Sequence, residues 1–222
     1  MINDKNVLLF RKILYICVFK IDNLKRLIMT KNTLLNIWII ICKFLRLFYI
    51  VIFLILTGIF VHFQFSPSSY ENIDFKAKIN DSGIFLKSST SYKIHVDGKI
   101  PEDSEVFILN KLTYSSLYFN YIKLAVILLL GFLSITEFQK IIESVKEIKT
   151  FQKRNVSSFR RIGKYILIIF VLGSYSSYTY QLGGTSGFYF SFNLLILALL
   201  AFIMAEIFKE GNLLLEENQL TV

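Results

Sequence analysis

The sequence predicts an all-α membrane protein, a four-transmembrane-helix bundle with a small β-rich extracytoplasmic loop. Three observations lead to this prediction. Hydrophobic residues make up 54% of the chain even with glycine left out, whereas soluble domains reach about 45–50% only when glycine is counted. Four apolar runs approach the length that crosses a bilayer. Basic residues gather beside those runs, as they do on the cytoplasmic flanks of membrane helices.

The four apolar runs are the predicted transmembrane helices. They cover residues 47–65, 117–138, 162–180 and 188–207. None contains an internal proline, and charges stand only near their ends, with Lys123 the deepest. A lysine at that depth can extend its ammonium to the interface. Because backbone amides inside a bilayer must be satisfied locally, each run is predicted to be helical.

Basic residues set the predicted orientation. Residues 1–46 contain nine Lys/Arg against two Asp/Glu, and residues 137–164 contain eight against three. Since cytoplasmic loops are enriched in Lys and Arg, both segments and both termini are predicted to be cytoplasmic, and 66–116 to face outward. The abundance of Lys, Ile, Asn, Phe and Tyr is typical of an AT-rich bacterial genome, so the predicted location is the bacterial cytoplasmic (inner) membrane.

The basic cytoplasmic N-terminal segment, 1–46, leaves two interpretations open. Residues 7–19 are apolar but interrupted by Arg11 and Lys12, and too short to span. They either form a basic amphipathic helix on the inner leaflet or lie upstream of a translation start at Met29. The far end of 47–65 lacks the small residues that a signal peptidase prefers, which favours an uncleaved anchor.

The outer connection, 66–116, is predicted to hold short antiparallel strands. Asp97-Gly98 is a turn signal within it. A second tight turn is expected at Gly183-Gly184, between the last two runs, next to an aromatic belt at the outer interface. The strand-like stretches are 73–79, 83–87, 91–96 and 106–109.

The inner connection, 139–161, is predicted to continue the second helix into the cytoplasm. Its apolar residues follow helical spacing and form a stripe that needs a cover. In the third run, Gly173, Ser174, Ser176 and Ser177 are small residues of the kind that let membrane helices approach closely.

No catalytic or metal-binding residue is predicted. His62 and His95 are distant and lack ligand-type neighbours, and Cys17 and Cys42 cannot complete a zinc site with them. No phosphate-binding loop or nucleophile motif occurs. We therefore expect no cofactor and no enzymatic activity. We also expect no direct nucleic-acid binding, because the net charge of +9 is concentrated beside the apolar runs.

Charged residues at the inner ends of the runs form one candidate site. Glu137 closes the second run and Glu206 the fourth, and Arg160, Arg161 and Lys164 flank the start of the third. We interpret them as a boundary salt-bridge cluster that fixes the helix ends, because a proton or ion site would need acids deeper in the membrane.

The cytoplasmic tail, 208–222, is the second candidate site. Gly211 is expected to end the fourth helix as its C′ residue, with a short helix after it. An apolar face on that helix would dock on a partner. The candidate partner-docking residues are Phe208, Gly211, Leu214, Glu216, Glu217 and Leu220.

The tail resembles the closing motif of the bacterial membrane family called domain of unknown function 2975. The matching residues are Glu206, Phe208, Lys209, Gly211, Leu214, Glu216, Glu217, Leu220 and Thr221. With the four-run layout, the resemblance covers 29–222. Family members are often encoded beside a small helix-turn-helix regulator, which implies a cytoplasmic partner of that kind.

The predicted function is that of a non-enzymatic multi-pass membrane regulator or sensor. The outer connection would meet an envelope signal, and the tail together with the apolar stripe of 138–151 would meet the cytoplasmic partner. The alternative is a small transporter or an immunity-type membrane protein. The lipid bilayer is the one partner that the apolar runs require, and the sequence predicts no oligomeric state.

Overall fold

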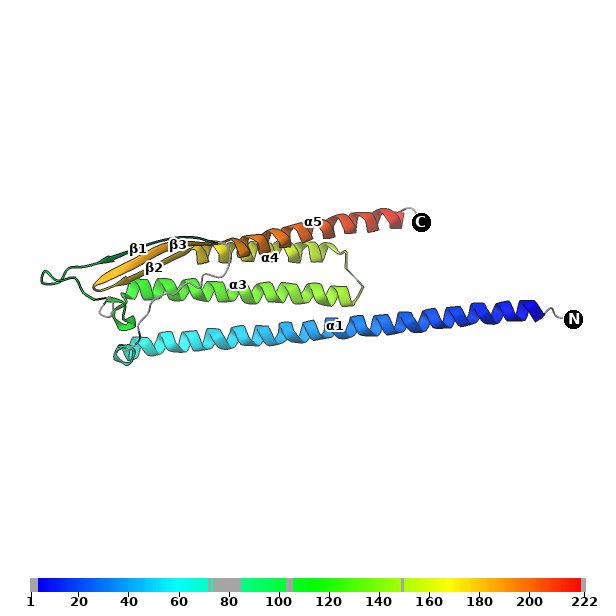
Figure 1. Cartoon of the computed structure of the whole chain (residues 1–222), viewed down its shortest axis with the longest axis horizontal. Helices are drawn as coiled ribbons and strands as arrows, with labels where there is room; N and C mark the ends of the chain where they lie inside the picture. The colour runs from blue at the N-terminus through cyan, green and yellow to red at the C-terminus, as the bar shows by residue number, and fades with distance from the viewer. Residues whose placement is uncertain (1–3, 72, 74–84, 103–105, 149, 221–222) are drawn as a thin grey trace.

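The computed structural model describes residues 4–71, 73, 85–102, 106–148 and 150–220, and only the backbone of 4–32, 85–87 and 220. The molecule is elongated, with its helices roughly side by side (Figure 1). A small sheet lies at one end and both termini lie at the other. We refer to these as the sheet end and the tail end.

Helix α1, Asp4–Phe65, is the longest element. Its segment Thr33–Phe65 is long and apolar enough to cross a membrane, and it contains the predicted run 47–65. Residues 4–32 continue the same helix past the tail ends of the other helices (Figure 1). The apolar stretch 7–19 therefore belongs to α1.

Two further helices are long and apolar enough to cross a membrane. Helix α3, Tyr114–Lys146, extends the predicted run 117–138 toward the tail end, as the inner stripe predicted. Helix α5, Phe192–Leu220, contains the third candidate span, Phe192–Gln219. The tail is part of this helix, so the expected helix end at Gly211 is wrong.

The predicted number of four transmembrane helices is not matched: the described residues contain three such helices. Helix α4, Lys153–Ser174, covers only part of the run 162–180 and begins with several basic residues. Residues 175–180 form strand β2 instead. Glycine at 173 weakens the helix, and the Tyr-, Ser- and Thr-rich stretch after it suits a pleated strand.

The sheet combines one strand from the outer connection 66–116 with a hairpin from residues 175–191. It has three antiparallel strands in the order β1-β3-β2: β1 is Phe85–Lys93, β2 is Tyr175–Tyr180 and β3 is Gly183–Ser191. Tyr180 pairs with Gly183, which leaves residues 181–182 as a two-residue hairpin turn. The turn expected at Gly183-Gly184 is therefore wrong, because both glycines lie in β3. Gly184 fits there because a Cβ on it would come within 2.8 Å of the Tyr92 ring.

The other stretches that the sequence predicts as strands only partly form strands. The stretches 83–87 and 91–96 contribute residues to β1. No strand forms over 106–109, where the 3₁₀ helix η2, Leu109–Lys111, begins. The stretch 73–79 lies outside the described residues except for Ile73, and a second 3₁₀ helix, η1, covers Pro67–Tyr70.

The predicted turn at Asp97-Gly98 is confirmed. Both residues have positive φ, 51° and 74°, and Val96 pairs with Lys99 across them. Positive φ at both central residues is the pattern of a type I′ hairpin turn, which favours Asp-Gly.

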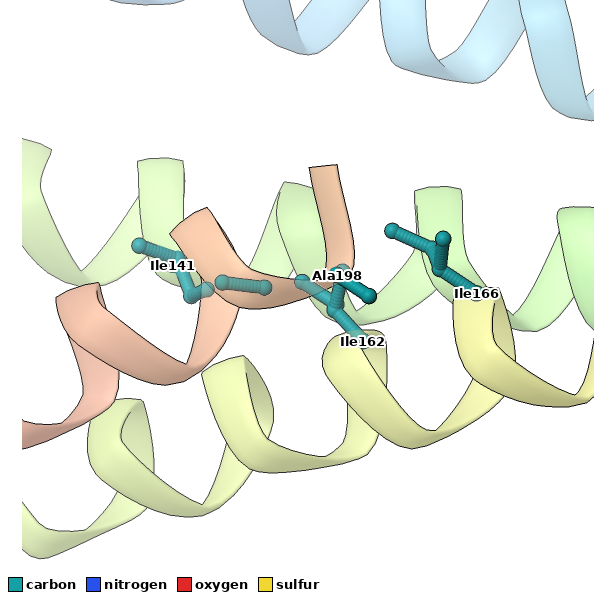
Figure 2. Packing of buried hydrophobic residues seen from close by; sticks show 5 residues of the cluster. Ile141, Ile162, Ile166 and Ala198 are labelled. Carbon is teal, nitrogen blue, oxygen red and sulfur yellow. The ribbon is translucent and has the colours of Figure 1, made fainter. Parts of the chain in front are cut away.

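The helices pack in sequence across the bundle, with α1 mainly on α3, α3 on α4, and α4 on α5. Figure 2 shows the buried cluster between the last three helices. Small alanines on α5 let its backbone approach the branched isoleucines closely. The cluster consists of Ile141 from α3, Ile162 and Ile166 from α4, and Ala198 and Ala201 from α5.

Glycines make two of the helix contacts close. A Cβ on Gly131 of α3 would lie 2.6 Å from Cε1 of Tyr49 on α1. One on Gly163 of α4 would lie 2.9 Å from Cζ of Phe202 on α5. By contrast, a Cβ on Gly173, a glycine that the sequence singles out for packing, would meet no atom of the described residues within 4 Å.

Candidate functional site

Phe208, a predicted docking residue, faces the interior of the bundle. Its ring is 8% exposed and packs 5.5 Å from the Phe151 ring and 4.9 Å from the Phe159 ring, centroid to centroid. With Val156 and Ala205 it forms a small core at the tail end. Phe208 therefore anchors α5 to its own chain.

Gly211 has a similar internal role. Its Cα side lies against the Phe151 ring, and a Cβ there would overlap that ring. The glycine lets the loop after α3 close over α5. Phe151, which ends the predicted apolar stripe, is thereby partly covered by the tail.

The rest of that stripe is covered mostly within the chain. Ile141 and Ile142 are buried, and Val145 packs against the cluster of Figure 2. Phe138 remains 44% exposed and Ile148 84% exposed. Contacts within the bundle thus bury most of the apolar stripe.

Beyond Gly211, α5 exposes leucines on several sides. Leu213, Leu214 and Leu215 are 42%, 60% and 45% exposed. Figure 1 shows this end of α5 reaching past the tail ends of α3 and α4. Three consecutive exposed leucines at the free end of a helix form an apolar surface that its own chain does not cover.

Acidic side chains accompany these leucines. Glu216 lies 3.1 Å from Lys153 Nζ at the start of α4, and it also accepts a hydrogen bond from Asn212 Nδ2 at 2.9 Å. Glu217 is exposed on the same segment. Leu220 is the last residue of α5, and its side chain lies outside the described part of the chain, as does Thr221.

The predicted boundary residues divide into two groups. Glu137, with a side chain only 7% exposed, accepts from Lys140 Nζ at 2.6 Å and Ser158 Oγ at 2.7 Å, and Arg161 Nη1 lies 3.4 Å away. The carboxylate of α3 is thereby fixed to α4. Buried carboxylates need such partners, because an unpaired one is costly.

The second group is exposed. Arg160 Nη2 lies 2.7 Å from Glu206 Oε1, and Lys209 Nζ lies 3.2 Å from Glu206 Oε2. The Arg160–Glu206 ion pair joins α4 to α5. Exposed ion pairs contribute little to stability. Lys164 is exposed and belongs to neither group of ion pairs among the described residues.

Two polar contacts at this end are not indicated by the sequence motifs. Asn155 is 1% exposed, and its Nδ2 donates to Ser144 Oγ at 2.8 Å and to the Thr150 carbonyl at 2.7 Å. It holds the α3–α4 connection closed. An asparagine in the first turn of α4, where its short side chain can bond to nearby backbone, is the only sequence signal for it.

A polar contact also joins α1 to α3. Arg46 Nη1 donates to Gln139 Oε1 at 3.3 Å, and Gln139 Nε2 donates to Glu143 at 2.7 Å. The Arg46 guanidinium lies 5.1 Å from the centre of the Phe132 ring, within cation–π range. Helices α1, α3, α4 and α5 are therefore all joined near the tail end.

The remaining candidates show no catalytic grouping in the described part of the chain. No three His, Cys, Asp or Glu residues gather there in a way that could hold a metal ion. His62 Nδ1 lies 2.9 Å from Tyr70 Oη, and His95 is exposed. Cys42 is buried with 3% exposure, and the side chain of Cys17 is outside the description.

The tyrosines of the sheet are expected from the sequence at an outer interface. Tyr180 is 2% exposed and packs edge-on against Phe107. Burial, and secondarily the neighbouring Tyr178, raises the pKa of Tyr180 to about 12, and burial also raises the pKa of Tyr178. Both phenols therefore stay neutral at ordinary pH.

These features define the class of protein to which the chain belongs. The chain is mostly helical, its described residues include three helices apolar enough for membrane insertion, and a small sheet closes one end. The family model described as "Protein of unknown function (DUF2975)" matches residues 94–222. The chain belongs to this family, as the tail motif indicated. No curated protein and no solved structure matches it.

Proposed function

We propose that this protein is a non-enzymatic regulator of the bacterial inner membrane that binds a cytoplasmic protein at the free end of α5. The observation that supports it is the exposed leucine segment 213–215, followed by Glu216 and Glu217. A surface of this kind, at the free end of α5 and uncovered by its own chain, is suited to a partner.

The charge of the segment indicates the kind of partner. After Lys209, the sequence contains Glu210, Glu216 and Glu217 and no Lys or Arg. An acidic and apolar helix end complements a basic, amphipathic surface. DNA-binding domains carry such basic surfaces, and the family resemblance implies a helix-turn-helix partner, so we infer a small protein of this class.

The location of the tail end supports the same proposal. Both termini lie at this end (Figure 1), and α4 begins there with Lys153, Arg154, Arg160 and Arg161. Basic residues beside membrane helices favour the cytoplasm. The tail end would therefore face the cytoplasm, and the sheet would face the cell envelope.

The geometry divides the tail residues by role. Phe208 and Gly211 hold α5 against the loop after α3, so their substitution would disturb the tail as a whole. Leu214, Leu215 and Glu217 are exposed and are the residues a partner would contact. A test of partner binding must therefore substitute exposed residues such as Leu214 or Glu217.

Site-specific photo-crosslinking in intact cells tests the proposal. A photoreactive side chain at position 214 or 217 is expected to capture one small basic DNA-binding protein, which mass spectrometry identifies. Tyr92, 52% exposed at the sheet end, is the matched control position and should not capture it. Leu214→Glu should abolish the product and change transcription of the genes that the captured protein controls.

Two outcomes would contradict the proposal. One is capture of the same proteins from positions 214 and 92, which would mark non-specific contact. The other is a product that Leu214→Glu leaves unchanged, because the leucine would then contribute nothing to binding. In either case the transporter or immunity-type interpretation becomes the better one.

A further inference from the structure

Two hollows follow one another along the contact between α1 and α3. The first has a volume of about 420 Å³ and a wholly apolar or aromatic lining, which includes Tyr49, Phe53, Ala125, Leu129 and Phe132. The second, also about 420 Å³, lies toward the sheet end. Tyr121 lines both, so they meet at its ring.

The second hollow differs in chemistry, because Asn120, Lys123 and Tyr178 are among its lining residues. Asn120 Nδ2 donates to the Ser116 carbonyl at 2.8 Å and to the Ser177 carbonyl at 2.9 Å. Carbonyl oxygens only accept, so these bonds fix which way the amide points.

The other end of that amide is left without a donor. Asn120 Oδ1 is buried and has no hydrogen-bond partner among the described residues. A buried acceptor without a partner costs free energy. Since the residue lines a hollow, a bound molecule with a hydroxyl or amino group could supply the missing hydrogen.

Lys123 adds a positive charge to the same hollow. Its Nζ donates to the Tyr175 carbonyl at 3.0 Å, and an ammonium has two further N–H groups. No carboxylate within the described ranges forms an ion pair with it. Exposed aromatic rings of the sheet, Tyr175, Phe188 and Phe190, lie near this level, as is typical of the membrane interface.

We propose that this seam binds one phospholipid with an anionic, hydroxyl-bearing head group. A head-group hydroxyl donates to Asn120 Oδ1, a phosphate oxygen accepts from Lys123 Nζ, and one acyl chain lies along the apolar hollow beside Ala125. The site goes beyond the tail-end partner surface and does not depend on it, since it lies between α1 and α3 whereas that surface is on α5.

Other occupants match the lining less well. An apolar helix would fill the first hollow but leave Asn120 Oδ1 unpaired and Lys123 without a counter-charge. A choline phospholipid offers a phosphate but no hydrogen-bond donor. The anionic hydroxylated head group satisfies both polar residues at once.

Native mass spectrometry of the full chain in mild detergent tests the site. The probes are dioleoyl phosphatidylglycerol and dioleoyl phosphatidylcholine, added in equal amounts. One retained phosphatidylglycerol per chain is expected, with a preference of about tenfold, the ratio that the hydrogen bond from its head-group hydroxyl to Asn120 Oδ1 supplies. Asn120→Leu, which removes the acceptor of the head-group hydroxyl, should remove most of the preference. Lys123→Met should reduce retention of both lipids, because both carry a phosphate, and Ala125→Trp should reduce retention of both by filling the apolar hollow.

Matched controls separate the site from general lipid contact. Lys164→Met removes an exposed basic residue on α4, and Leu199→Trp enlarges an exposed residue on α5; both should leave retention and preference unchanged. Circular dichroism identifies any variant that fails to fold. Equal retention of the two lipids, or an equal effect of Lys164→Met and Lys123→Met, would overturn the proposal in favour of non-specific annular lipid.

Discussion

Gly211 of α5 lies so close to Phe151 that a Cβ on it would come within 2.6 Å of the ring atom Cε1. Phe151 in turn packs against Phe208. Two residues of the family-like tail motif thus fasten α5 to the α3–α4 connection. The motif therefore combines an internal fastening with the exposed leucines that follow it.

Gly211→Ala is expected to destabilise the protein by about 1–2 kcal/mol, because overpacking at Phe151 outweighs the gain in helix propensity. The measurement is the thermal unfolding midpoint of the purified chain in detergent. Gly58→Ala is the matched control. It introduces the same methyl in α1, where a Cβ would meet no other side chain or element of the described residues within 4 Å, so it should be neutral or stabilising. A second change, Phe151→Leu, should recover part of the loss, and equal effects of the two alanine variants would contradict the contact.

Glu137→Gln is expected to cost about 1–3 kcal/mol, since it weakens charge-assisted hydrogen bonds at a buried position. The carboxylate accepts from Ser158 at 2.7 Å and from Lys140 at 2.6 Å. Glu206→Gln makes the same chemical change at an exposed ion pair and should leave the unfolding midpoint unchanged. If both variants shifted the midpoint equally, burial would not distinguish the two groups.

Ile148→Asn is expected to stabilise the protein by about 1 kcal/mol, because asparagine tolerates the left-handed backbone that a β-branched residue resists. Ile148 has φ 61° where the chain leaves α3, and its side chain is 84% exposed, so little packing is lost. The readout is again the unfolding midpoint. Ile100→Asn, at an exposed position with 64% exposure, controls for the change in polarity and should have no effect. If Ile148→Asn lowered the unfolding midpoint, the inference that the backbone at residue 148 is strained would be contradicted.

The sequence is sufficient for the features that follow from local chemistry. The apolar runs 47–65 and 117–138 correspond to parts of α1 and α3, and Asp97-Gly98 forms the expected turn. The continuation of α3 also follows from helical spacing, since Ile141 is buried against α4 and α5. In each case the pattern within one segment decides the structure.

The predictions that are wrong concern contacts between segments that are distant in the sequence. The absence of charge and proline after Lys164 favours one helix up to residue 180. Residues 175–180 instead pair with the hairpin strand β3, which pairs in turn with β1. Gly211 is typical of a helix end, whereas here it serves a contact with Phe151. Neither partner can be recognised from the segment alone, because pairing depends on the tertiary fold.

Tyr180 gives the sheet end a dependence on alkaline pH. Its pKa is raised to about 12 by burial, whereas an unfolded tyrosine titrates near about 10. Below about pH 10 the phenol is neutral in both states and contributes no pH dependence. Between about pH 10 and 12 the unfolded chain ionises first, so the free energy of unfolding should fall by about 2–3 kcal/mol.

The measurement is the unfolding midpoint, followed by circular dichroism from about pH 8 to 12, the range that brackets both phenol pKa values. Tyr180→Phe should flatten the decline, although not completely, because the pKa of Tyr178 is also raised by burial. Tyr114→Phe, at a ring that is 69% exposed, is the matched control and should follow the parent. Lysines titrate over the same range in every variant, so the difference between the two phenylalanine variants is the informative quantity. If those two declines coincide, Tyr180 is not buried as the fold requires, and the β2–β3 hairpin does not pack against Phe107.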